Sequence, residues 1–339
     1  MKKTLFLLAL NLFNGYLLIA QTSTELYENA MKYKAKDNLT EAGKLMAKAL
    51  VEDPQNLAYK KEFADIQYSR RLYFDAIPIY EELLVSDDKN IVYLARLAEM
   101  YSMSPKKMKG IEYAEKALNL NPTDGDVNKM LARTYLEVGH YPQAVRLYLR
   151  AEKVLPNDRD LPFKIANCYE KMNKYTESMN YYIKAFNLDP ENPTKIYEAA
   201  LSCYNANQYM KSIEFYQLAE DKGYLKTKFF YENWALTYIE MKDYEKSLFY
   251  YAKAKDYAPY DKDLNIAIAE VYMKKGDFNK ARSILDEILE INPEDAEVIY
   301  TKGMTYYKAG NTTKAESFFN QAFAIDPSLR SLRYTKTNF

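Results

Sequence analysis

Histidine, cysteine, glycine and proline are all scarce in this chain of 339 residues, and neither charge is in excess. One histidine and two cysteines leave little material for a metal site or a catalytic nucleophile. The 47 basic and 47 acidic residues balance, whereas a nucleic-acid-binding protein needs a basic surface to neutralise phosphates. We therefore expect no metal, no cofactor and no nucleic-acid partner. Tyrosine is abundant at 34 residues, and many rings with few helix breakers predict helices packed through aromatic side chains.

The first twenty residues have the pattern of a secretory signal peptide. Lys2 and Lys3 precede an apolar run over Leu5–Ile19, and the small residue Ala20 follows it. The run is short and polar at its centre, which favours a cleaved signal over the alternative of an uncleaved membrane anchor. We predict cleavage after Ala20, no transmembrane segment in the mature chain, and export to a periplasmic, outer-membrane-associated or secreted location.

The rest of the chain repeats with a period of 34 residues. Seven prolines are spaced by 34 residues or by about twice that number, namely Pro54, Pro122, Pro156, Pro190, Pro259, Pro293 and Pro327. This spacing defines nine units that begin at Ser23, Leu57, Ile91, Gly125, Arg159, Pro193, Lys228, Lys262 and Ala296. One inserted residue makes the junction at 222–227 irregular, and its Gly223 predicts a bend or hinge there.

Two positions of the unit are small in all nine copies. The eighth position holds Ala30, Ala64, Ala98, Ala132, Ala166, Ala200, Ala235, Ala269 and Gly303. The twentieth holds Ala42, Ala76, Gly110, Ala144, Ser178, Ser212, Ser247, Ala281 and Ala315. Small residues are required where two helix backbones cross closely. Tyrosines recur at the eleventh, seventeenth and twenty-fourth positions, where we interpret them as core packing.

Turn and cap residues divide each unit into two antiparallel helices. Side chains that can cap the next helix follow each junction, at Asn56, Asn90, Asp124, Asp158, Asn192, Thr227, Asp261 and Asp295. Residues suited to a left-handed turn separate the two helices of several units, at Gly139, Asn173, Asn207, Gly276 and Gly310. No strand pattern is present, so the sequence predicts an all-α fold.

The pattern resembles the tetratricopeptide repeat, whose signature is a set of aromatic, small and proline residues at fixed offsets. The seventh unit shows it as Tyr231, Trp234-Ala235, Tyr238, Ser247, Tyr251 and Pro259. The resemblance covers residues 21–329 and leaves 330–339 as a short tail or partial cap. The sequence departs from the residue types of the family signature at Lys302 and Cys203. The resemblance implies a right-handed superhelical solenoid of antiparallel helix pairs, with a concave groove lined by the first helices.

The resemblance also implies which residues line the groove, namely those at positions two, five, nine, twelve and thirteen of each unit. In the middle units we expect Phe163, Asn167, Glu170, Tyr197, Leu201, Tyr204, Phe229, Glu232, Leu236 and Ile239. The alternative is that several of them only pack between first helices. Two known uses of the family are not matched. Arg133 follows Lys129 where a carboxylate clamp needs asparagine, and only Asn167 could belong to an asparagine ladder.

Candidate catalytic groups are few. His140 falls in a turn between two helices, where a solvated role is expected, and no glycine-rich phosphate loop is present. Cys168 and Cys203 lie on the first helices of adjacent units; export permits a disulfide between them, although buried free thiols are the expected state. We therefore predict a protein that is not an enzyme.

The function predicted from the sequence is that of an exported scaffold for protein–protein or peptide binding through the concave groove, in cell-envelope assembly or secretion. The alternative is a soluble periplasmic capture protein for an oligosaccharide or a small peptide, for which exposed ring faces at Tyr197 and Tyr204 are needed. Apolar residues of the last helix, with Leu329, Leu332 and Tyr334 as a partial cap, favour self-association through the C-terminal end.

Overall fold

The computed structural model describes residues 22–331. The predicted signal peptide, Leu332 and Tyr334 therefore lie outside the described residues. Within 22–331 every regular element is helical, which confirms the all-α prediction, and no helix combines the length and apolar character needed to cross a bilayer. The chain divides into two compact units, Met1–Cys168 and Tyr169–Phe339, and the boundary falls inside the helix α9.

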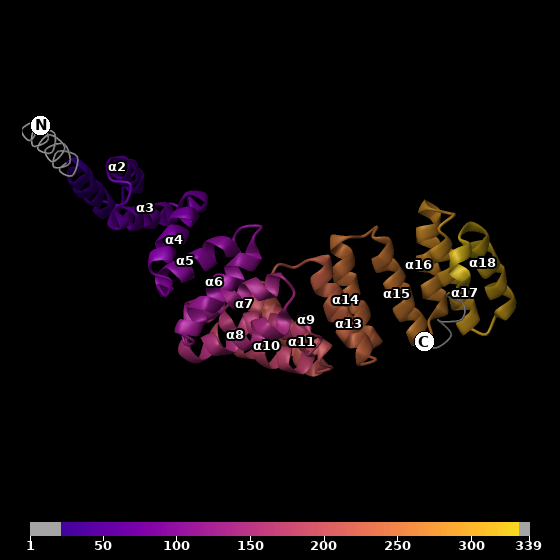
Figure 1. Ribbon diagram of the computed structural model, residues 1–339. Coiled ribbons are helices and arrows are strands. Elements are labelled where there is room, and N and C mark those ends of the chain that lie inside the picture. The colour runs from indigo at the N-terminus through magenta and orange to yellow at the C-terminus, as the bar shows by residue number, and fades with distance from the viewer. Residues whose placement is uncertain (1–21, 332–339) are drawn as a thin grey trace, which may run out of the picture. The chain divides into compact units, whose positions relative to one another are not determined.

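The first unit is a series of helix pairs (Figure 1). Residues 22–35 are helical. The helices that follow are α2 (Leu39–Glu52), α3 (Leu57–Ser69), α4 (Tyr73–Ser86), α5 (Ile91–Ser102), α6 (Lys107–Leu120), α7 (Gly125–Glu137), α8 (Tyr141–Val154) and α9 (Leu161–Lys171). Each repeat contributes two of them in succession, joined by a short turn.

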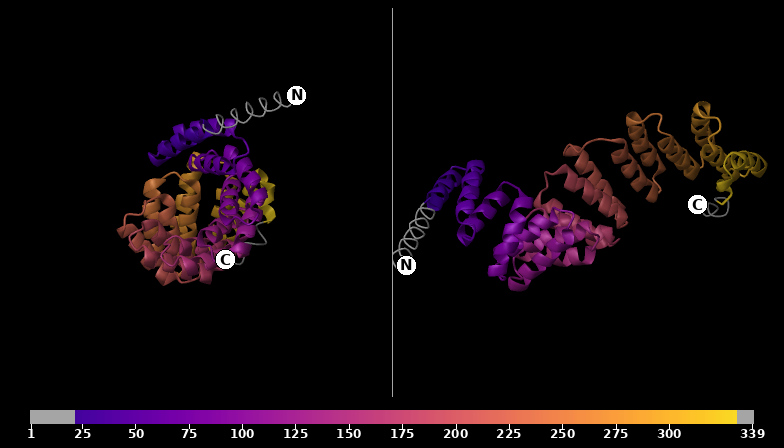
Figure 2. Two further views of the ribbon diagram at one scale, coloured as in Figure 1. Left: turned by 60° about the vertical axis from the view of Figure 1, so that its left-hand side comes forward. Right: turned by 45° about the horizontal axis from the view of Figure 1, so that its top comes forward.

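The second unit continues the same order of elements, and Figure 2 shows its hairpins from two further directions. Its helices are α10 (Tyr175–Leu188), α11 (Pro193–Asn205), α12 (Tyr209–Asp221), α13 (Lys228–Glu240), α14 (Tyr244–Tyr257), α15 (Lys262–Lys275), α16 (Phe278–Ile291), α17 (Ala296–Lys308) and α18 (Thr312–Ile325). A short 3-10 helix, η1 (Pro327–Ser331), follows α18. Leu329 of η1 is buried against Phe319 and Phe323 of α18, so η1 covers part of the last hairpin.

Both small-residue positions are buried in all nine repeats, which confirms their predicted role at the helix crossings. Large side chains fill the complementary positions. The tyrosines at the twenty-fourth position are at most 2% exposed, namely Tyr80, Tyr148, Tyr182, Tyr216 and Tyr251. The tyrosines at the eleventh and seventeenth positions are less deeply buried, and Tyr33, at the eleventh, is 41% exposed. The predicted tyrosine core is therefore centred on the twenty-fourth position.

The predicted turn residues are confirmed, with φ between 57° and 87° at Gly139, Asn173, Asn207, Gly276 and Gly310. Asp37, Arg71 and Lys242 occupy the same turn position with positive φ, although their residue types did not predict it. Seven of the eight predicted caps accept backbone hydrogen bonds as N-caps; Asp158 accepts one from Asp160, but α9 begins only at Leu161. Pro162 lacks an N–H and fits only the first helical turn, which explains this later start.

The irregular junction at 222–227 is packed by aromatic rings. Gly223 has a φ of 81°, and the residues after it run without regular structure into α13. The ring of Tyr224 stacks on Tyr197 at a centroid distance of 4.3 Å and contacts Phe230 at 5.4 Å. The bend or hinge at this junction stays a prediction.

Candidate binding cleft

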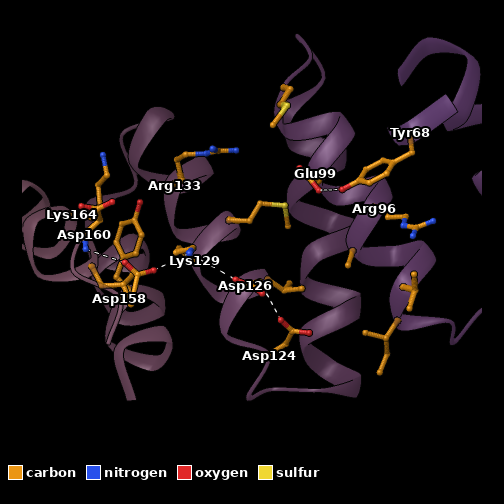
Figure 3. A pocket seen from close by; sticks show the side chains of 18 residues that line it. Tyr68, Arg96, Glu99, Asp124, Asp126, Lys129, Arg133, Asp158, Asp160 and Lys164 are labelled. Atoms are coloured by element: carbon orange, nitrogen blue, oxygen red, sulfur yellow. Dashed lines mark hydrogen bonds and ion pairs between the residues drawn. The ribbon is translucent and has the colours of Figure 1, made fainter. Parts of the chain in front are cut away.

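A cleft of about 610 Å³ opens on the first helices of the third, fourth and fifth repeats, within the first unit (Figure 3). It is lined by residues from α5, α7 and the start of α9, with Tyr148 of α8 and with Tyr68 of α3 at one end. Twelve of its eighteen residues occupy repeat positions two, five, six, nine, twelve and thirteen. Val92 and Met103 are 55% and 54% exposed, so an apolar surface is accessible beside the charged groups.

Charged side chains of both signs line the cleft. The basic ones are Arg96, Lys129, Arg133 and Lys164, and the acidic ones are Glu99, Asp124, Asp126, Asp158 and Asp160. Because both signs are present, the positions of these charged side chains, rather than the net charge of the lining, decide what the cleft can bind. Figure 3 shows Arg133 and Lys164 toward one side of the cleft and Asp124 toward the opposite side.

Lys129 is held by Asp158, which immediately precedes the next repeat. Its Nζ lies 2.9 Å from Asp158 Oδ2 and 3.8 Å from Asp126 Oδ1. The hydrogen bond that Lys129 donates to Asp158 is the main reason why the pKa of Lys129 is raised. The same kind of bridge recurs in the second unit, where Lys228 Nζ lies 2.7 Å from Asp261 Oδ2. Lys129 therefore has a structural role in joining neighbouring repeats.

At one end of the cleft a cation is already neutralised within the protein. Arg96 donates hydrogen bonds to the carboxylate of Asp65 and to the hydroxyl of Tyr80, and Tyr80 in turn donates to Asp65. Burial and then the bond to Asp65 raise the pKa of Tyr80 well above its ordinary value. Beside them, Tyr68 donates to Glu99. The guanidinium of Arg96 is therefore already paired within the protein at this end.

The other end of the cleft is open. Arg133 is 48% exposed along its side chain, and its contact with Glu137 is long, with 4.0 Å between Nε and Oε1. Lys164 is exposed. Tyr148 is 1% exposed and lines the cleft between these helices. Within the described part of the chain, no hydrogen bond of the Tyr148 hydroxyl is found.

The groove residues expected from the sequence lie elsewhere. Phe163 and Asn167 are on α9 in the first unit, where neither lines the cleft, and the other eight are in the second unit. There the ring of Tyr197 stacks on Tyr224, and its hydroxyl accepts a hydrogen bond of 2.9 Å from Asn233 Nδ2.

Their surroundings in the second unit differ from residue to residue. Leu201 and Ile239 are partly buried against the core around Trp234. Glu170 accepts a hydrogen bond of 3.0 Å from Tyr182, Glu232 lies 3.7 Å from Lys228 Nζ, and Tyr204 contacts Tyr209 at 5.9 Å. Phe229 and Leu236 are 66% and 37% exposed. A binding role for these ten residues stays a prediction.

The sequence contained the signal for the cleft. The groove positions taken from the family give ten residues in the third and fourth repeats. Seven of them line the cleft, namely Val92, Ala95, Glu99, Met103, Asp126, Lys129 and Arg133, whereas Ser102, Leu136 and Glu137 do not. From the sequence alone, Lys129 and Arg133 fit only a carboxylate clamp that they do not complete. The role of position six, which holds Arg96 and Lys164, depends on contacts between repeats.

The few candidate reactive groups lie outside the cleft lining. His140 precedes α8, where it is exposed and stacks on Tyr135 at 5.8 Å. Cys168 and Cys203 are buried free thiols, and burial raises their pKa to about 11 and about 12. Among residues 22–331 no group of three or more histidine, cysteine, aspartate or glutamate residues could hold a metal ion.

Comparisons with known proteins agree with the helix pairs. Models of the tetratricopeptide repeat match residues 238–303, 276–333, 113–146 and 163–192. A solved tetratricopeptide repeat protein from Parabacteroides merdae is similar to 75% of this chain and 98% of its own, with 18% identity and a TM-score of 0.50. No curated protein matches the sequence significantly.

Two further solved structures are similar over shorter parts. The MamA protein covers 49% of this chain and 91% of its own, with 17% identity and a TM-score of 0.46. YrrB, described as a TPR protein with an unusual peptide-binding site, covers 56% and 97%, with 20% identity and a TM-score of 0.43. The repeat models, the buried small positions and the succession of helix pairs agree on one family. The chain belongs to the tetratricopeptide-repeat proteins.

Proposed function

We propose that this protein is a non-enzymatic scaffold that binds an extended segment of a partner protein in the cleft over α5, α7 and α9. The observation that carries the proposal is the cleft itself, whose volume of about 610 Å³ lies within the range of known ligand sites. It combines accessible apolar surface at Val92 and Met103 with the exposed cations Arg133 and Lys164. Repeat arrays expose such surfaces because each repeat contacts only its neighbours.

Filling the cleft should abolish binding. Val92 is 55% exposed and lines the cleft, so Val92→Trp adds bulk there without disturbing the core. Peptides of twelve residues would be selected on the full chain from a random phage-displayed library, and their Kd measured by fluorescence anisotropy. We expect Val92→Trp to weaken binding by about tenfold or more, because a blocked hot spot of at least about 1.4 kcal/mol is lost.

Val85→Trp is the matched control, because Val85 is 85% exposed and lies outside the cleft lining. It should leave the Kd unchanged. A library that yields no binding peptide, or peptides that bind Val92→Trp as tightly as the unaltered chain, would refute the proposal.

Export is part of the same proposal and rests on the pattern of the first twenty residues. When the full-length gene is expressed in a two-membrane bacterium, the intact mass of the protein in the periplasmic fraction should correspond to a chain that begins at Gln21. A cytoplasmic protein that retains Met1 or Lys2 would contradict export. A role in envelope assembly or secretion would follow from that location together with a protein partner.

The oligosaccharide alternative has less support. It needs exposed ring faces at Tyr197 and Tyr204, but Tyr197 is stacked on Tyr224 and also contacts Tyr216 and Phe230. Its ring therefore belongs to the packing between α11, α13 and the irregular junction. We propose protein binding rather than sugar binding for this reason.

A further inference from the structure

We propose that the second unit has a separate site, formed by α12, α13 and α14, that binds the side chain of an arginine on a partner protein. The site shares no residue with the cleft of the first unit, so it does not rest on the proposed function. Three observations carry it, namely a cavity beside the irregular junction, a buried donor without an acceptor, and two carboxylates without a cation.

The cavity has a volume of about 500 Å³ and lies within the second unit. It is lined on one side by α12 and on the other by the rings of Trp234 and Tyr238 of α13 and Tyr250 of α14. Six residues, 222–227, connect α12 to α13, whereas four residues, 258–261, connect α14 to α15. The longer connection allows α12 to stand apart from these rings, so the irregular junction accounts for the cavity.

Trp234 brings a polar group to a repeat position that is apolar in most other repeats. This seventh position holds residues such as Leu97 and Ile268, which need no hydrogen-bond partner. Trp234 is 1% exposed and its ring stacks on Tyr250 at 4.0 Å, but its Nε1 has no acceptor within residues 22–331. Buried donors nearly always have a partner in folded proteins. A carbonyl oxygen of a ligand in the cavity is therefore a suitable acceptor for this N–H.

The polar side chains of the lining all come from α12. Glu214 and Asp221 are exposed and seven residues apart, which places them on one face of the helix at a spacing of about 10 Å. Gln217 lies between them and donates a hydrogen bond of 3.0 Å to Asp221 Oδ1. In the part of the chain that the structure describes, neither carboxylate has an ion pair, and the lining contains no lysine or arginine.

The lysines that lie over the rings of the cavity do not neutralise these two carboxylates. Lys246 lies over the ring of Tyr238, but its Nζ is 3.4 Å from Asp243 Oδ2. Lys253 lies over the rings of α14, but its Nζ is 3.7 Å from Glu220 Oε1. Both lysines are therefore paired outside the lining, and the cavity is left with an excess of negative charge.

An arginine side chain matches this combination of groups. Its guanidinium forms charge-assisted hydrogen bonds with carboxylates, stacks on aromatic rings and is weakly hydrated. Its aliphatic stem can pack on Ile213 and Leu218, which also line the cavity. The ammonium of lysine is more strongly hydrated and has no planar surface to stack, so lysine is the poorer ligand.

The test uses the full chain labelled with ¹⁵N, in which Trp234 gives the single indole N–H resonance because the chain has one tryptophan. The probes are acetylated, amidated Gly-Arg-Gly and the same peptide with citrulline, which keeps the shape of arginine without its charge. The arginine peptide should move the indole resonance downfield to saturation, with a Kd at least about tenfold lower than that of the citrulline peptide. No saturable shift, or equal Kd values, would overturn the inference.

Variants assign the preference to the two carboxylates. Glu214→Gln and Asp221→Asn change exposed side chains, so the fold should be kept; each should weaken the arginine peptide severalfold and leave the citrulline peptide unchanged. Asp256→Asn is the matched control, because Asp256 is exposed on α14 and lies outside the cavity lining. Unchanged binding of the arginine peptide by both lining variants would contradict the receptor.

Two further results discriminate between ligands and between sites. A lysine peptide that binds as tightly as the arginine peptide would overturn the assignment to a guanidinium. The cleft of the first unit also carries carboxylates, so Asp126→Asn is tested as well and should leave the shift of the indole resonance unchanged. A shift that is lost in Asp126→Asn but kept in Glu214→Gln would place the peptide in the cleft and refute the second site.

Discussion

Replacing Trp234 with alanine is expected to lower the free energy of unfolding by about 3–5 kcal/mol, the usual cost of removing a large buried aromatic side chain. Trp234 is 1% exposed and belongs to a cluster that includes Tyr216, Phe230 and Tyr238. Its ring stacks on Tyr250 at 4.0 Å. Truncation would leave a cavity at the centre of the second unit that the surrounding rings cannot fill without moving.

The measurement is urea unfolding followed by far-ultraviolet circular dichroism, which does not depend on the lost tryptophan. Since coupling in repeat arrays is between neighbours, the data should be fitted with a nearest-neighbour model. Tyr260→Ala is the control because Tyr260 is 86% exposed in the same unit; it should change stability by less than about 0.5 kcal/mol. A loss below about 1 kcal/mol for Trp234→Ala would contradict the packing described here.

Gly110→Ala is expected to destabilise the protein by about 1–3 kcal/mol, although alanine is the better helix former. A Cβ at Gly110 would lie 2.9 Å from the backbone nitrogen of Ser102 and 3.0 Å from the carbonyl oxygen of Ala98. Both are backbone atoms of α5, so the hairpin of α5 and α6 would have to separate. Glycine is required here because a Cβ would meet backbone atoms of α5 rather than a side chain that could move.

Gly43→Ala is the matched control and should have the opposite sign. Gly43 is also inside a helix, but its new Cβ would meet the Nη1 atom of Arg70 at 3.0 Å, which is the end of a flexible side chain. We expect it to stabilise by up to about 1 kcal/mol through helix propensity. The midpoints of thermal unfolding of the two variants, compared with that of the unaltered chain, test both expected signs. A Gly110→Ala protein as stable as Gly43→Ala would show that the crossing is not tight.

Most of the fold could be predicted because its determinants are local and repeated. A small residue at a crossing, a capping side chain after a junction and a glycine or asparagine in a turn each act within a few residues. Arg71 and Lys242 show the limit, since nothing in their residue types predicts a left-handed conformation. Their φ is imposed by turns of constant length between two packed helices.

The site could be predicted only in part, because its chemistry depends on contacts between residues about 30 positions apart. Arg96 and Arg133 both contribute a guanidinium to the cleft, but Asp65 neutralises Arg96. Tyr80 and Tyr148 occupy the same repeat position, and only the neighbours that the fold brings to them make them different. Tyr197 was expected in the groove by its position, yet the inserted residue of the junction allows Tyr224 to stack on it.

Photo-cross-linking of a selected peptide that carries benzoylphenylalanine tests the cleft most directly, because methionine side chains react readily with this group. Met103 and Met130 line the cleft, whereas Met108 and Met210, each 61% exposed, lie outside its lining. Mass spectrometry of the cross-linked full chain should place the peptide on Met103 or Met130. Cross-links at Met108 or Met210, or on α11 and α13, would show that the peptide binds elsewhere.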